Sequence, residues 1–253
     1  MSPDPRQSGE MPFLEHLEEL RRVLLQSLVA VAIGAAAGWW LAPRVLEDII
    51  RRTVRHVIVL SPLEALNERI KLTLVLGLVL TLPFVLYRIW SFVVPGLLKR
   101  ERSWIGPMVF GSLFMFVLGA WAAYGYVIPL VIQVLGGFMT PSMEPQIQVG
   151  PLLSFVYNLM LACGVVFQLP LVTMTLTALG LVTPRFLLQQ WRIAIVLVFL
   201  VTAIITPGDV VTAQIVMGIP MTLLYFLSVG LSWLVARRRS ASSATVIGEG
   251  DRA

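Results

Sequence analysis

Long apolar runs alternate with polar breaks along most of this chain. Six runs are separated in this way, and they cover residues 23–41, 72–94, 104–128, 152–178, 193–206 and 210–235. Most of them approach or exceed the roughly 20 apolar residues that a helix needs to cross the hydrocarbon core of a bilayer. The pattern therefore predicts an all-α integral membrane protein with six transmembrane helices.

The fifth run is shorter than the others. Its 14 residues, 193–206, would rise only about 21 Å as a helix, against a hydrocarbon core roughly 30 Å thick. A tight turn at residues 206–209 joins it to the sixth run. We therefore expect spans five and six to be short.

The two ends of the chain are polar. Residues 1–11 and residues 240–253 carry few large apolar side chains, so we expect a disordered lead and a disordered tail. Between them, residues 12–239 are predicted to form a single membrane domain. It begins with an amphipathic helix over residues 12–22, in which one face carries Glu15, Glu18, Glu19 and Arg22 and the other carries apolar side chains, mostly leucines.

Arg21 and Arg22 precede the first apolar run, as they would in a cleavable signal peptide. Length argues against that alternative, because the apolar region of a signal peptide has roughly 7 to 15 residues. The run at 23–41 reaches spanning length and ends in Trp39, Trp40 and Pro43, as an interfacial aromatic belt should. We therefore predict that it is the first span.

Composition supports the membrane assignment. Hydrophobic residues make up 57% of the chain and charged residues 13%, which is more apolar than the surface of a soluble domain allows. The single Cys163 lies inside an apolar run and provides no disulfide framework. No basic patch with interleaved aromatics stands outside the loops, so we predict no nucleic-acid partner.

Charge indicates the orientation. Six of the 19 Lys and Arg residues fall within residues 44–71, where four acids partly offset them, and the others lie on the side that holds both termini. The two remaining loops opposite the termini contain no cation. The positive-inside rule therefore predicts a protein of the cytoplasmic (inner) membrane with both termini in the cytoplasm.

Arg88 and Gln168 fall within predicted spans. Arg88 lies near the cytoplasmic end of the second span, where its long stem lets the charge reach the interface. Gln168 lies deep in the fourth span, where an unpaired amide costs several kcal/mol, so it needs a partner or water. A hydrogen bond between helices and a functional role both remain open for it.

The break over residues 92–102 separates the second and third spans. Pro95 and Gly96 end a helix there, because proline lacks an amide donor and glycine tolerates a left-handed turn. Three cations mark this break as cytoplasmic. One acid, Glu101, stands among them, which raises the question of what a carboxylate beside Phe92 would bind.

Several short motifs follow one another along the chain. They are HLEELRR at residues 16–22, PFVLYRIW at 83–90, Phe92, PGL at 95–97, ER at 101–102, FQLP at 167–170 and TPGD at 206–209. Any one of them alone is a weak signal. The ordered set, over residues 12–235, resembles TatC, the six-span subunit of the twin-arginine protein translocase.

The resemblance implies a receptor. TatC-like proteins bind the twin-arginine signal peptides of folded precursor proteins on their cytoplasmic face. They then assemble with single-span TatA-type and TatB-type partners in the lipid bilayer and export the cargo with the proton-motive force. The resemblance also implies a non-enzymatic subunit without metal or cofactor that works as a homo-oligomer in the receptor complex.

By the family's motif, Glu19, Arg21, Phe92 and Glu101 fall on positions linked to signal recognition. The chemistry agrees, because a guanidinium presents a planar fork to a carboxylate, and two adjacent arginines call for two carboxylates from different segments. Each residue also has an ordinary interpretation. Glu19 would be a solvated acid, Glu101 a complement to the dipole of the third span, Phe92 a core or lipid-facing ring, and Arg21 an interfacial anchor.

The resemblance also marks polar residues toward the end of the chain. Thr206, Asp209 and Gln214 match the outer end of the family's fifth and sixth spans, a region linked to TatA and TatB docking. Asp209 has an alternative role as N-cap of the sixth span. Many TatC-like sequences have a glutamate where this chain has Gln168, and a neutral amide argues against carrying a proton.

A small ion-coupled secondary transporter is the alternative function. It would need polar groups that converge at mid-membrane, and only Gln168 plainly lies there. An enzyme is disfavoured, because His16 and His56 fall outside the spans and the sequence offers no metal-ligand pair or nucleophile with a nearby base.

Overall fold

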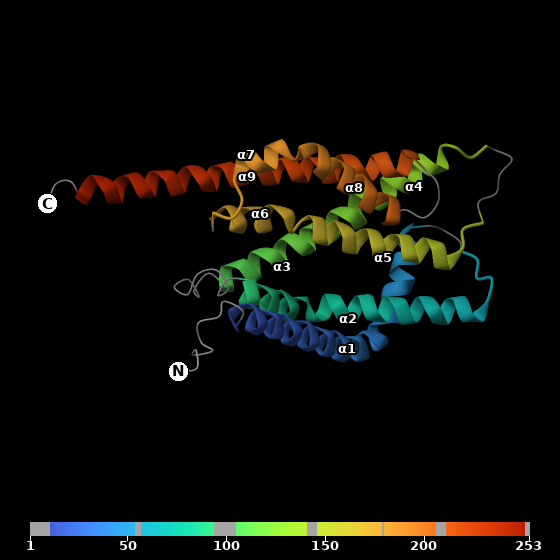
Figure 1. Cartoon of the computed structure of the whole chain (residues 1–253). Coiled ribbons are helices and arrows are strands. Elements are labelled where there is room, and N and C mark those ends of the chain that lie inside the picture. The colour runs from blue at the N-terminus through green and yellow to red at the C-terminus, as the bar shows by residue number, and fades with distance from the viewer. Residues whose placement is uncertain are drawn as a thin grey trace. The chain divides into compact units, whose positions relative to one another are not determined.

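Figure 1 shows the computed structural model of the chain, which describes residues 11–53, 57–93, 105–140, 146–178, 180–205 and 211–250. Contacts divide the chain into two compact units. Unit 1 comprises Met1–Asp48 and Arg69–Leu113, and unit 2 comprises Ile49–Glu68 and Phe114–Ala253. The predicted disordered lead lies outside the described residues, except for Met11.

The elements in these ranges are helices. In chain order they are α1 (Met11–Thr53), α2 (Pro62–Val93), α3 (Ile105–Ala122), the π-helical turn η3 (Ala123–Val127), α4 (Ile128–Gly136), α5 (Val149–Val166), α6 (Leu169–Ala178), α7 (Pro184–Gln189), α8 (Trp191–Ile205) and α9 (Val211–Gly250).

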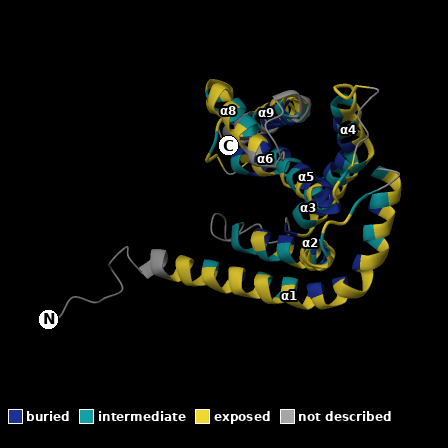
Figure 2. Cartoon of the chain, turned by 90° about the vertical axis from the view of Figure 1, so that its right-hand side faces the viewer, coloured by how far each residue is buried: buried dark blue, intermediate teal, exposed yellow. Residues whose placement is uncertain are grey.

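The described residues contain four helical stretches long and apolar enough to span a membrane: Glu15–Thr53, Pro62–Val93, Ile105–Gly136 and Val149–Ala178. Two shorter apolar stretches, Trp191–Leu200 and Gly218–Leu234, lie in α8 and α9. Large apolar side chains are exposed along these helices, and Figure 2 shows that much of α1 is exposed. The prediction of an all-α membrane fold with short fifth and sixth spans is confirmed.

In unit 1, α1 and α2 run antiparallel and meet through glycines. A Cβ at Gly34 would lie 2.6 Å from the carbonyl oxygen of Gly77, and one at Gly38 would lie 2.9 Å from that of Thr73. The two backbones therefore approach so closely that there is room for glycine, whose side chain is a hydrogen atom, but not for a residue with a Cβ. The four-residue spacing of Gly34 and Gly38 is a sequence signal for such packing between membrane helices.

The first helix is longer than predicted. We expected the first span to end at Trp39, Trp40 and Pro43, but α1 continues through Pro43 to Thr53. A proline removes only one amide donor from the helical ladder, and helices tolerate this by bending. Ile49, which is buried, extends the apolar face of the helix beyond that point.

The end of α2 is fastened to α3. The indole Nε1 of Trp90 donates a hydrogen bond to the Oγ of Ser112 at 2.7 Å, and both side chains are buried. This bond holds the helices on either side of the break that separates the second and third spans. Residues 94–104 of that break lie outside the described part of the chain.

The third span also continues beyond its predicted end at residue 128. The amide of Ile128 donates to the carbonyl of Ala123, five residues earlier, and α4 then extends to Gly136. Because η3 places a π-type turn directly before Pro129, the proline falls in the first turn of α4, where its missing amide costs nothing. Pro129 therefore redirects the helix and does not end it.

The fourth span is two helices. α5 ends at Val166 and α6 begins at Leu169, so Phe167 and Gln168 form a turn just before Pro170. The predicted continuous run over residues 152–178 is therefore interrupted at Gln168. Pro170, two residues later, has no amide hydrogen to donate to a helical partner.

The last helix packs along α6 and α8 in unit 2. The hydroxyls of Thr177 in α6 and Ser232 in α9 form a buried hydrogen bond. α9 continues to Gly250, which differs from our expectation of a disordered tail from residue 240. The sequence contains no proline between Pro220 and that point, so nothing in it forces the helix to stop.

Candidate functional site

The beginning of α1 and the end of α2 meet through a pair of stacked rings. The imidazole of His16 lies on the ring of Phe92, with centroids 4.4 Å apart and an angle of 15° between the planes. His16 is exposed and Phe92 is half-buried. The contact places the N-terminal end of α1 directly beside the last turn of α2.

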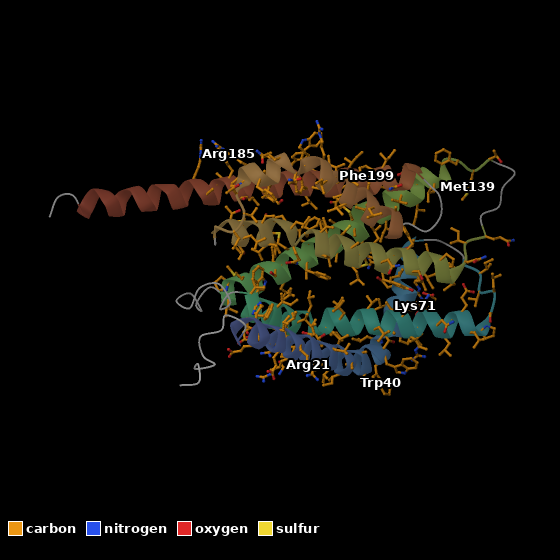
Figure 3. All side chains as sticks on the ribbon, in the orientation of Figure 1. Arg21, Trp40, Lys71, Met139, Arg185 and Phe199 are labelled. Carbon is orange, nitrogen blue, oxygen red and sulfur yellow. The ribbon has the colours of Figure 1, made fainter. Side chains whose placement is uncertain are left out.

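Glu19 and Arg21 are both exposed on α1, but they lie on different faces. A helix turns about 100° per residue, so Glu19 is about 60° around the axis from His16, whereas Arg21 is about 140° away. Glu19 therefore lies on the face that carries the contact with Phe92. Arg21, labelled in Figure 3, lies on a different face of α1.

Three predicted site residues lie outside the described residues. Glu101 belongs to the break at 94–104, and Thr206 and Asp209 belong to the turn at 206–210. Their roles stay predictions. What the structure adds for Glu101 is that both helices flanking its segment are held together by the bond between Trp90 and Ser112.

Gln214 joins α9 to α8. Its amide Nε2 donates to the carbonyl oxygen of Phe199 at 2.8 Å, and the hydroxyl of Thr202 donates to the same oxygen at 2.9 Å. The ring of Phe199, labelled in Figure 3, lies where a Cβ on Gly218 would come within 2.9 Å of it. Phe199 thus organises the contact between the two short spans.

Gln168 is half-buried in the turn between α5 and α6. Its backbone N–H donates to the backbone carbonyl of Val165 at 2.9 Å, and its backbone carbonyl accepts from the N–H of Val172 at 2.9 Å. The residue therefore bridges the two halves of the fourth span through its backbone, so its polar character coincides with a break in the helix.

A second polar cluster, which we call the outer clamp, joins the start of α2 to the start of α5. The Glu64 carboxylate accepts from the amides of Gly150 and Leu60, each at 2.9 Å. The hydroxyl of Tyr157 donates to the carboxylate of Glu68, which is buried, and lies 2.9 Å from the hydroxyl of Ser154.

The described residues contain no group of three or more His, Cys, Asp or Glu side chains placed to hold a metal ion. The polar groups of the outer clamp and of the contact between α8 and α9 donate to or accept from one another or the backbone.

The family model described as Sec-independent protein translocase protein (TatC) matches residues 15–220. The chain belongs to the TatC family. Among curated relatives, the TatC of Koribacter versatilis is 32% identical over 248 residues, covering 92% of this chain and 91% of the relative. The TatC of Aquifex aeolicus is 36% identical over 236 residues, covering 90% and 98%.

Solved structures agree with the family assignment. A crystal structure of the twin-arginine translocase receptor TatC matches with a TM-score of 0.81 at 36% identity, covering 87% of this chain and 99% of that one. A second, in DDM, matches with a TM-score of 0.79 at 35% identity. This TatC-family chain is therefore a multi-pass membrane protein and a receptor subunit of the twin-arginine translocase, without enzymatic activity.

Sequence reasoning does not identify several contributors to these clusters, and three of them show why. His16 belongs to the HLEELRR motif, which by itself gives the ring no role, and Phe199 carries no signal because it lies within an apolar run. Glu68 was counted only as a charge that offsets nearby cations, yet its contact with Tyr157 spans 89 residues of sequence. Only the first of these had a usable signal, as a polar ring at helical spacing from Glu19.

Proposed function

We propose that this TatC-family chain binds the twin-arginine signal peptides of folded precursor proteins at the cytoplasmic end of α1 and α2. Bound precursor is then exported by an assembly that contains further copies of this chain and single-span TatA-type and TatB-type partners, driven by the proton-motive force. The observation that carries the proposal is the stack of His16 on Phe92, because it puts the face of Glu19 beside the last turn of α2, from which the chain continues toward Glu101.

The chemistry of the pair explains selectivity for two arginines. Glu19 comes from α1 and Glu101 from the break after α2, so the two carboxylates approach from different segments, as two adjacent guanidinium groups require. Each charge-assisted hydrogen bond contributes about 1.5–3 kcal/mol, and less where water screens it. One face of the Phe92 ring lies on the imidazole of His16, so a guanidinium plane would stack on the opposite face.

Binding of a labelled twin-arginine signal peptide to the detergent-solubilised chain tests this proposal. We expect Glu19→Gln to raise the Kd roughly tenfold, the equivalent of one charge-assisted bond. Glu101→Gln should do the same. A peptide with Lys-Lys in place of the arginine pair should bind as weakly, because an ammonium group has no planar fork.

Glu18→Gln is the matched control. Glu18 is an exposed acid in the same turn of α1, but it lies about 160° from His16 around the helix axis. Its replacement should leave the Kd unchanged. Equal losses in Glu18→Gln and Glu19→Gln would reduce the effect to net charge, and wild-type affinity in Glu19→Gln would refute the site.

We propose that the partner subunits dock beside α8 and α9. Both apolar stretches are shorter than a bilayer requires, so lipid beside them must thin, and a partner helix packed there would cover the mismatch. Gln214 and Phe199 fix the geometry of this edge. Thr206 and Asp209 lie in the turn beyond it, and Gln168 is the remaining polar group proposed for contact within the membrane.

Both termini are proposed to be cytoplasmic, and cysteine labelling tests this. In intact cells, a membrane-impermeant maleimide should label Leu60→Cys but not Glu18→Cys. Leu60 is exposed and belongs to the charged segment 44–71, on the side of the membrane opposite the termini in this proposal. Both should react after the membrane is opened. The native Cys163 is buried and gives little background. Labelling of Glu18→Cys in intact cells would invert the proposed orientation.

A further inference from the structure

An open groove of about 560 Å³ lies between α1 and α2, and neither the proposed peptide site nor the partner edge uses it. The residues that α1 contributes are Leu25, Gln26, Val29, Ala30 and Ile33. Those that α2 contributes are Phe84, Tyr87 and Arg88. All of them belong to unit 1, so the groove is a feature of a single packing unit.

The groove is polar at one end and apolar at the other. Because α1 and α2 are antiparallel and His16 stacks on Phe92, Gln26 and Arg88 lie toward the same end. Ile33 and Phe84 line the opposite end. The distance along α1 from Gln26 to Ile33 is about 10 Å, which covers most of the hydrocarbon depth of one leaflet, about half of 30 Å.

The polar end carries a cation. Nε of Arg88 is buried and has no hydrogen-bond partner among the described residues, and no acidic side chain lines the groove. A guanidinium group has five N–H donors and stays charged, so leaving one of them buried without an acceptor is unfavourable. A ligand that brings anionic oxygens to this end would therefore be complementary to the guanidinium group of Arg88.

We propose that the groove is a binding site for an anionic phospholipid of the leaflet that faces the N-terminal end of α1. The phosphate accepts from Arg88, with Gln26 and Tyr87 as further polar neighbours, and an acyl chain follows Val29 and Ile33 into the bilayer. The positive charge disfavours a cationic peptide at the same place. In the orientation proposed above, this is the cytoplasmic leaflet.

Native mass spectrometry of the full chain in detergent tests the site with added phosphatidylglycerol or phosphatidylcholine. The wild type should prefer phosphatidylglycerol about fivefold, the factor that corresponds to one cation near a membrane surface. Arg88→Gln should abolish the preference. Arg185→Gln removes an exposed arginine of α7 outside the groove and should retain it. Equal binding of both lipids to the wild type, or a retained preference in Arg88→Gln, would overturn the proposal.

A second pair of variants tests the apolar end. Val29→Trp fills the groove and should weaken binding of phosphatidylglycerol, whereas Leu28→Trp, at an exposed neighbour that does not line the groove, should not. The twin-arginine peptide should bind both variants like the wild type. If Val29→Trp weakens peptide binding and leaves the binding of phosphatidylglycerol as strong as in the wild type, the groove holds the apolar part of a signal peptide and the lipid site is wrong.

Discussion

Replacing Gly77 by leucine is expected to prevent α1 and α2 from packing and to lower the free energy of unfolding by about 3 kcal/mol or more, at the upper end of what overpacking costs. A Cβ at this position would lie 2.5 Å from the amide nitrogen of Ala35, 2.7 Å from its Cα and 2.8 Å from the carbonyl oxygen of Val31. All three atoms belong to the backbone, so no rotamer change relieves the clash. Because the same helix pair carries His16 and Phe92, peptide binding should be lost with the fold.

Gly106→Leu is the control for this substitution. Gly106 lies in α3, is exposed, and a Cβ there would meet no heavy atom within 4 Å. Leucine also has a higher helix propensity than glycine. Unfolding of the purified variants in detergent, followed by circular dichroism, should separate the two proteins clearly, and equal midpoints would mean that the close approach of the helices does not limit stability.

Replacing Tyr157 by phenylalanine is expected to lower the free energy of unfolding by about 1–3 kcal/mol, the cost of removing one partner from a buried polar group. Glu68 is only 3% exposed, and the phenol hydroxyl of Tyr157 donates to its carboxylate. Phenylalanine keeps the ring and its packing but takes away the donor. The bonds of Glu64 to Gly150 and Leu60 in the outer clamp would remain.

Tyr126→Phe provides the matched comparison. The side chain of Tyr126 is 65% exposed, so its hydroxyl is available to solvent or lipid headgroups, and the edge-to-face contact of its ring with Trp121 would survive. Thermal unfolding of this variant should match the wild type. A loss of stability as large as that in Tyr157→Phe would show that any tyrosine hydroxyl has this effect and that the bond to the buried carboxylate is not its cause.

The prolines show where sequence reasoning reached its limit. We predicted that Pro43 ends the first span and that Pro129 follows the end of the third, but α1 passes through the former and η3 and α4 accommodate the latter. A proline removes one hydrogen bond wherever it stands. Whether the helix ends, bends or inserts a π-type turn depends on the neighbours that pack around it, and these come from other parts of the chain.

Some features of the candidate site could likewise be predicted from the sequence, whereas others depend on how the helices pack. That Glu19 and Arg21 lie on different faces follows from helix geometry alone and was available from the sequence. That Phe92 is the ring beside Glu19's face depends on the antiparallel pairing of α1 with α2, which the glycines permit. The groove at Arg88 arises from the same pairing, so its charge could be read in advance but its surroundings could not.

The sequence by itself determined the class of protein, the approximate positions of the spans and the family. Hydrocarbon offers no hydrogen bonds, so an apolar run of spanning length must satisfy its own backbone as a helix. The family is recognisable because its motifs follow one another in order along the chain. The tertiary structure alone decided which polar groups meet. The contacts of Tyr157 with Glu68 and of Gln214 with Phe199 depend on how the helices pack, and in a membrane that packing is set by close van der Waals fit, which periodicity does not encode.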